Sequence, residues 1–165
     1  MFSDCMNLKT PPQNIVLDNV GYADSMFFNC LNLTNIPQMH ITNKCTCISW
    51  MFSNCNNLTD INFNNVNIWG QYVFANCYNL HTIRMNNIHS NNMHNMFIYC
   101  RGVRDIILTN IDYFGTNAMM TYLIYHCDNL NNFTISNFYA ANCVSYAGGE
   151  FADDYMHVKT FNLYD

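Results

Sequence analysis

Charged residues are scarce in this chain: Asp, Glu, Lys and Arg make up 10% of its 165 residues, and the formal net charge is −5. In an ordinary globular domain about a quarter of the residues are charged. The 6 basic residues form no cluster, so the chain lacks the positive surface with which proteins bind a phosphate backbone. We therefore expect no nucleic-acid partner.

Glycine and long apolar runs are also lacking. None of the 6 glycines forms a phosphate-binding loop, and the pair Gly148–Gly149 suits a bend. No apolar run approaches the ~18 to 20 residues of a membrane-spanning helix. A repeat begins directly at Met1, without a charged and apolar leader. We expect no nucleotide site, no membrane insertion and no signal peptide.

What the chain does contain is a phrase that recurs about every 25 residues: an apolar pair, two variable residues, a cysteine, two more residues and an aliphatic. It is clearest as MFSNCNNL from Met51 and VFANCYNL from Val73. The other copies begin at Met1, Met26, Met96 and Leu123, and a degraded copy begins at Glu150. A repeat of this length is typical of a solenoid, in which each coil buries its apolar face against its neighbours.

A second element follows each phrase and has the pattern Ile-x-apolar-x-Asn-apolar, as in residues 61–66. Apolar residues two positions apart lie on the same side of an extended chain, so we expect a short strand with its aliphatics directed inward. The apolar spacing of three and four residues in the phrase suits a short helix on the opposite wall. The second repeat is looser, because Gln38 and His40 place polar groups in two slots of the pattern.

These patterns predict an α/β fold built as one domain over residues 1–165. The domain would be a solenoid of about seven coils, each with a short parallel strand and a short helix. Strands stacked in register would form one curved parallel sheet, with neighbours about 4.8 Å apart.

Asparagine supplies most of the polar surface, with 29 residues at fixed places in the repeat. We interpret these residues as a mixture of turn formers and inward ladders whose amides satisfy the backbone at each bend. The alternative, a low-complexity tract, fits less well because the asparagines follow the repeat.

Cysteine recurs at one position of the repeat, where a small buried apolar side chain is expected. A disulfide ladder is the alternative, but stacked side chains that point the same way rarely meet the narrow geometry of a disulfide. The residues are Cys5, Cys30, Cys55, Cys77, Cys100 and Cys127. Cys45-x-Cys47 beside His40 resembles metal ligands but lacks the second pair that a zinc site requires. We predict no metal site.

The histidines occupy scattered positions of the repeat and form no arrangement with a nucleophile or a carboxylate. We therefore predict that the chain is not an enzyme, has no catalytic residues and needs no cofactor.

The repeat MFSNCNNLTDINFNNV from Met51 resembles the BspA-like leucine-rich repeats, in particular the branch with MFxxCxxL repeats described from mycoplasma surface proteins. The resemblance covers nearly the whole chain and implies a leucine-rich-repeat solenoid. It also implies an interaction protein of the cell surface or the extracellular space, which binds a protein or a glycan, often in adhesion, and shares no catalytic residues with its relatives.

With the geometry of that family, the residues that point outward from the sheet form the predicted binding face. They are Val16, Asp18, Met39, Asp60, Asn62, Asn64, Arg84, Asn86, Asp105, Ile107, Thr109, Thr134 and Tyr164. Apolar and aromatic members of such a face can anchor a partner.

A second function class stays open at this point: a structural subunit of a phage virion, such as a fibre, spike or decoration protein. The absent leader, the low charge and the asparagine-rich composition favour it. The first repeat also starts without a capping segment, and an uncapped coil favours stacking on another chain. We therefore also predict self-association, or assembly with another chain, through the N-terminal repeat.

Overall fold

The computed structural model describes residues 1–42, 44–113, 122–139 and 160–164. Its elements are the strands β1 (Ile15–Val16), β2 (Met39–His40), β3 (Asp60–Trp69), β4 (Thr82–Asn92), β5 (Asp105–Tyr113), β6 (Asn132–Tyr139) and β7 (Thr160–Tyr164). We number the coils from the start of each phrase, so that coil 1 comprises residues 1–25, coil 2 residues 26–50, coil 3 residues 51–72 and coil 4 residues 73–95.

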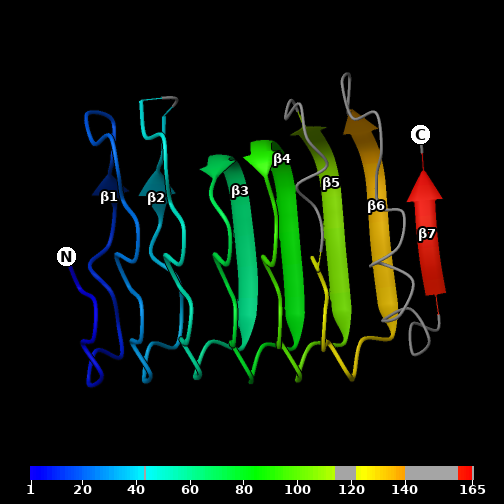
Figure 1. The fold of residues 1–165 in the computed structure, drawn as a ribbon, viewed down its shortest axis with the longest axis horizontal. Helices are drawn as coiled ribbons and strands as arrows, with labels where there is room; N and C mark the ends of the chain where they lie inside the picture. Colours follow the sequence, from blue (N-terminus) through cyan, green and yellow to red (C-terminus); the bar gives the residue numbers. More distant parts are fainter. Residues whose placement is uncertain (43, 114–121, 140–159, 165) are drawn as a thin grey trace.

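The strands lie side by side in sequence order and pair in parallel, as expected for a solenoid (Figure 1). They form two sheets, however: β1 pairs with β2, and β3 to β7 form a separate five-stranded sheet. The expectation of one continuous sheet is therefore wrong. The number of seven coils stays a prediction, because residues 140–159, which contain the degraded phrase, lie outside the described residues.

The core runs along the axis as a stack of phenylalanines, one from each of the first five phrases. The ring centroids of Phe2 and Phe27 are 5.1 Å apart, and those of Phe27 and Phe52 are 5.3 Å apart. The stack continues to Phe74 at 5.4 Å and to Phe97 at 6.1 Å. This apolar spine therefore passes from coil 2 to coil 3 without interruption, although the sheet does not.

The phrases form the second wall of the solenoid, which we call the turn wall, and no described residue in it is helical. The N–H of Phe52 donates to the carbonyl of Val73 in the next coil at 2.9 Å instead of bonding within its own coil. Trp50 and Asn54 have φ values of 55° and 63°, which lie outside the helical region. The expected short helix is thus absent from the described residues, where consecutive turns take its place.

Five of the six repeated cysteines line the turn wall from inside, and their burial confirms the interpretation as small core residues, which is wrong for Cys5 in the end coil. They also hydrogen-bond between coils, which the sequence did not reveal. The thiols of Cys55, Cys77 and Cys100 donate to phenylalanine carbonyls of the preceding coil, with Sγ–O distances of 3.2, 3.2 and 3.1 Å. Burial raises the pKa of Cys55 and of Cys100 to about 12, so both thiols keep the proton that they donate. Cys5 is exposed.

An asparagine ladder runs along β3 to β6 at a corner within each of these strands, and between β4 and β5 the amide of Asn110 donates to Asn86 Oδ1 at 2.8 Å. The side-chain amide of Asn87 donates to Asn65 Oδ1 at 2.7 Å, and that of Asn137 donates to Asn110 Oδ1 at 2.8 Å. Asn65 and Asn87 have φ values of 56° and 54°, a left-handed conformation that asparagine tolerates better than most residues. These side chains are exposed. The prediction that such ladders point inward is therefore wrong for this one.

Candidate functional site

The outward side of the five-stranded sheet carries three rows of aligned residues. The middle row joins Asn62, Arg84, Ile107 and Thr134 on β3 to β6. The flanking rows are Asp60, Thr82, Asp105 and Asn132 on one side, and Asn64, Asn86, Thr109 and Ser136 on the other. The structure thus brings nine of the predicted site residues onto one face. Tyr164 is aligned with Ser136 at the end of the third row.

Hydrogen bonds connect polar side chains within the flanking rows. Thr109 Oγ1 donates to Asn86 Oδ1 at 2.8 Å, and the amide of Asn132 donates to Asp105 Oδ1 at 2.5 Å. In the middle row, exposed Arg84 lies directly opposite half-buried Ile107. The face therefore has a cationic and an apolar group at its centre, with amides, hydroxyls and the carboxylates of Asp60 and Asp105 around them.

The three predicted site residues of coils 1 and 2 lie apart from these rows. Val16 is exposed and pairs with His40, whose Nδ1 lies 2.6 Å from Asp18 Oδ1. Met39 pairs with Ile15 and packs against the core. Met39 was therefore placed wrongly on the outward face, because the polar slots of the second repeat left the register of that strand ambiguous.

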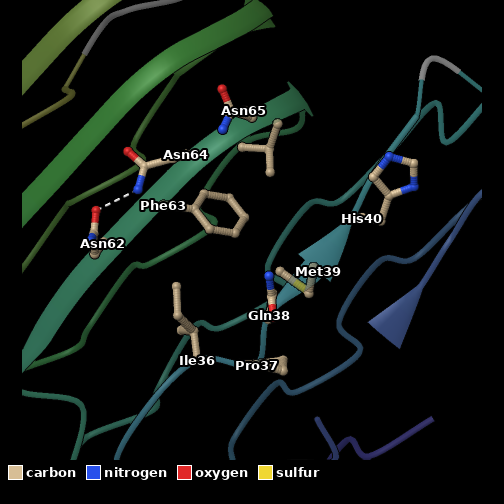
Figure 2. A pocket seen from close by; sticks show the side chains of 10 residues that line it. Ile36, Pro37, Gln38, Met39, His40, Asn62, Phe63, Asn64 and Asn65 are labelled. Carbon is tan, nitrogen blue, oxygen red and sulfur yellow. Dashed lines mark hydrogen bonds between the residues drawn. The ribbon is translucent and has the colours of Figure 1, made fainter. Parts of the chain in front are cut away.

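A cavity of about 400 Å³ lies where the two sheets separate, and we call it the opening. Its lining residues are Ile36, Pro37, Gln38, Met39, His40, Asn62, Phe63, Asn64, Asn65 and Val66. Figure 2 shows β3 on one side of the opening and the segment that carries β2 on the other, with Phe63 and Met39 between them.

Two strand edges without a backbone partner face each other across the opening. The N–H groups of Ile15 and Leu17 donate to the carbonyls of Gln38 and His40, both at 2.9 Å, so this side of coil 2 is bonded to coil 1. Backbone groups of a parallel strand alternate between its two neighbours. The groups of Met39 therefore face β3. Among the described residues, no backbone hydrogen bond joins residues 36–41 to residues 60–68.

The edge of β3 also presents backbone groups without a backbone partner to the opening. Because the inward residues of β3 bond to β4, the N–H and C=O groups of Asn62 and Asn64 point toward coil 2. The opening ends at Trp69, whose carbonyl accepts a 2.9 Å hydrogen bond from the N–H of Ile48. On the turn wall, coils 2 and 3 are joined by a hydrogen bond in which the N–H of Phe27 donates to the carbonyl of Met51 at 2.9 Å. The opening is confined to one wall.

Sequence reasoning did not predict the opening, although two signals for it were present. His40 stands four residues after Ile36, where the other repeats have the ladder asparagine, as Asn65 does after Ile61. Pro37 has no N–H to donate to a neighbouring strand. Both residues occur in coil 2, whose strand β2 has only two residues.

The described residues also bear on membrane insertion and on metal binding. No helix in the described part is long and apolar enough to cross a bilayer. The described residues also contain no group of three or more metal-ligating side chains. Cys45 is buried and Cys47 is half-buried with its Sγ 3.2 Å from Ser49 Oγ.

Comparison with protein families identifies the repeat. The BspA type leucine rich repeat region matches residues 22–147 in six copies. Comparison with curated proteins and with solved structures gives no significant match. Proteins with such repeats are typically non-enzymatic and generally mediate protein binding, and BspA-type members are commonly associated with the cell surface. Because the matched region covers most of the chain and agrees with its parallel solenoid, this protein belongs to the BspA-type leucine-rich repeat family.

Proposed function

We propose that residues 1–165 form a single repeat domain that binds a protein partner through the outward face of its five-stranded sheet. The observation that carries the proposal is the pairing of Arg84 with Ile107 at the centre of that face. Interfaces concentrate their binding energy in central arginine and apolar or aromatic residues surrounded by a polar rim. The amides and hydroxyls of the flanking rows fit the rim.

The proposed biological role is attachment at the cell surface or in the extracellular space. The surface association common in the family supports this role. A glycan is the other ligand class for the face, because its amides can donate and accept hydrogen bonds. The central arginine–isoleucine pair favours a protein.

The test compares variants of the central pair in a binding screen. The chain is screened against a displayed protein library and against a glycan array, and each ligand found is then titrated. Arg84→Glu and Ile107→Glu should each weaken the binding of a protein ligand by about tenfold or more. Tyr78→Ala, an exposed change on the turn wall, is the matched control and should leave binding unchanged. Unchanged binding in both face variants would remove the proposal, and exclusive binding of glycans would change the ligand class.

A second role, as a subunit that assembles with copies of itself or with a virion, is supported by a different surface. The outer side of coil 1 has a cavity of about 380 Å³ beside the exposed apolar side chains of Met1, Val16 and Tyr22, which are 93%, 63% and 75% exposed. Apolar surface of this kind favours contact with another chain. Sedimentation should show an oligomer that dissociates in the Val16→Glu, Tyr22→Glu double variant. A monomer at all concentrations would exclude self-association.

A further inference from the structure

We propose that the opening between β2 and β3 binds an extended segment of a protein partner, which enters as an additional strand. The inference rests on the proposed function and deepens it, because it names the structural element of the partner that is recognised. Its occupant is specified by the backbone groups at the opening.

The backbone groups at the two edges of the opening fit an inserted strand. The N–H and C=O groups of Met39 on one side, and those of Asn62 and Asn64 on the other, point into the same space. A single exposed strand edge can be extended by a peptide strand, which is a common mode of recognition. Here two edges face each other, so an inserted backbone can bond on both of its sides.

The size of the opening is the second argument. An extended chain rises about 3.3 Å per residue, so three residues cover roughly 10 Å. That length corresponds to Asn62, Phe63 and Asn64, the part of the cavity lining on β3 that precedes the left-handed Asn65. On the turn wall, the Phe27–Met51 hydrogen bond of 2.9 Å and the 5.3 Å ring stacking of Phe27 on Phe52 hold the two coils together. The opening therefore admits a short segment and not a bulky element.

The side chains around the opening specify the sequence of the segment. Phe63 is buried and Met39 is half-buried, and both form an apolar floor on the inward side. Gln38 and Asn62 are exposed and form a polar rim. Side chains of a strand alternate between its two faces, so the fitting segment has a small apolar residue between two polar ones. Asp60 at the start of β3 disfavours acidic residues in the segment.

The test uses the peptide acetyl-Thr-Thr-Val-Thr-Thr-amide as the probe. Its matched control has the same side chains but N-methyl groups on the three central amides, which removes the donors and keeps the rest. The unmodified peptide should bind the full chain and slow the hydrogen exchange of the Asn62 and Asn64 amides. The methylated peptide should bind at least about tenfold more weakly, since two or more backbone hydrogen bonds are lost. Equal binding of the two peptides, or no binding of either, would overturn the proposal.

Two protein variants test the same contact from the other side. Asn62→Pro removes an N–H that faces the opening and takes no part in the β3–β4 pairing, so it should abolish peptide binding. Asn62→Ala keeps that N–H and should retain binding. A thermal melt checks that both variants are folded, and if the proline variant is not, the methylated peptide decides alone. Equal peptide binding by two folded variants would contradict insertion.

The same variants separate this inference from the proposed function. With a protein ligand in hand, loss of binding in Arg84→Glu but not in folded Asn62→Pro rejects insertion and leaves the binding face intact. Loss in Asn62→Pro, with binding kept in Asn62→Ala, Arg84→Glu and Ile107→Glu, rejects the binding face and supports insertion. Loss in both supports a partner that contacts the face and also inserts a strand.

Discussion

Coils 1 and 2 differ from the later coils in one wall only. Their phrases stack on the turn wall like the others, and Phe2 and Phe27 continue the same ring stack. Their strands, however, are two residues long, whereas β3 has 10 residues and β4 has 11. The two walls of this solenoid are therefore specified independently by different parts of the repeat.

The comparison also shows what a long strand requires here. Each of the strands β3 to β6 contains a left-handed asparagine at its corner, and side-chain hydrogen bonds such as that of Asn87 to Asn65 link neighbouring strands there. In coil 2, His40 stands four residues after Ile36, at the sequence offset of that asparagine, and its Nδ1 lies 2.6 Å from Asp18 Oδ1 in coil 1. The sheet separates where the ladder ends. Four experiments test how far the two regions differ.

The largest effect is expected from Phe52→Ala in the shared spine. Phe52 is fully buried and stacks on rings of both neighbouring coils, so its truncation should cost about 3–5 kcal/mol in the free energy of unfolding. Phe2→Ala, a half-buried ring with one stacking neighbour, should cost clearly less. Urea denaturation measures both. Equal costs would mean that coil 1 is packed as tightly as the interior.

Gly70→Ala targets the boundary between coils 2 and 3. A Cβ at this position would lie 2.6 Å from the backbone nitrogen of Ser49, and neither backbone can move freely. The change should destabilise the chain by about 1–3 kcal/mol and speed hydrogen exchange in coils 1 and 2 first. Gly21→Ala is the control, because nothing lies within 4 Å of its Cβ. Uniform faster exchange would show that the two regions are not separable.

Asn87 tests the ladder that distinguishes the later strands. Asn87→Ala forces a left-handed alanine and removes the 2.7 Å bond to Asn65, with an expected cost of about 1–2 kcal/mol. Asn87→Gly removes the same bond but adopts the conformation easily, so it should cost less. Thermal denaturation separates the two effects. If both variants lose the same stability, the hydrogen bond and not the backbone conformation maintains the corner.

The smallest effect at neutral pH concerns the thiols. The folded-state pKa of Cys55 and Cys100 is about 12, against an ordinary value of 9.0, so the folded chain holds these protons more tightly than the unfolded chain does. The stabilisation is fully present below pH ~9 and is lost as the pH rises to about 12. Urea denaturation across this range should show the decline, and Cys55→Ala should reduce it. At neutral pH, exposed Cys5 should react with a thiol reagent long before Cys55 does. Equal reaction rates would contradict the burial of the stack.

Much of this architecture was predictable because the repeat specifies it redundantly. The period of the phrase and the two-residue spacing of Ile61 and Phe63 were enough to predict parallel strands and their inward faces. The rows around Arg84 and Ile107 followed from that register. Met39 was misplaced because a strand with polar residues in apolar slots does not indicate which side is buried.

Two further errors have local causes. Apolar residues at three- and four-residue spacing fit a helix, but they fit equally well two turns separated by a left-handed residue such as Asn54. The direction of the Asn65–Asn87 ladder depends on the same backbone conformation, which composition does not indicate. The opening itself lies between two coils, and its signals in the sequence, Pro37 and His40, stand out only when coil 2 is compared with the other repeats.

The interrupted sheet above a continuous aromatic spine has a mechanical consequence. Under tension along the axis, coils 3 and 4 share the load between two walls, whereas coils 2 and 3 carry it on the turn wall and on the bond from Ile48 to Trp69. Such one-sided support converts a pulling force into bending, so the rod should flex at this joint before any coil unravels. A partner strand bound between β2 and β3 would brace this joint, so binding of the partner would stiffen the solenoid.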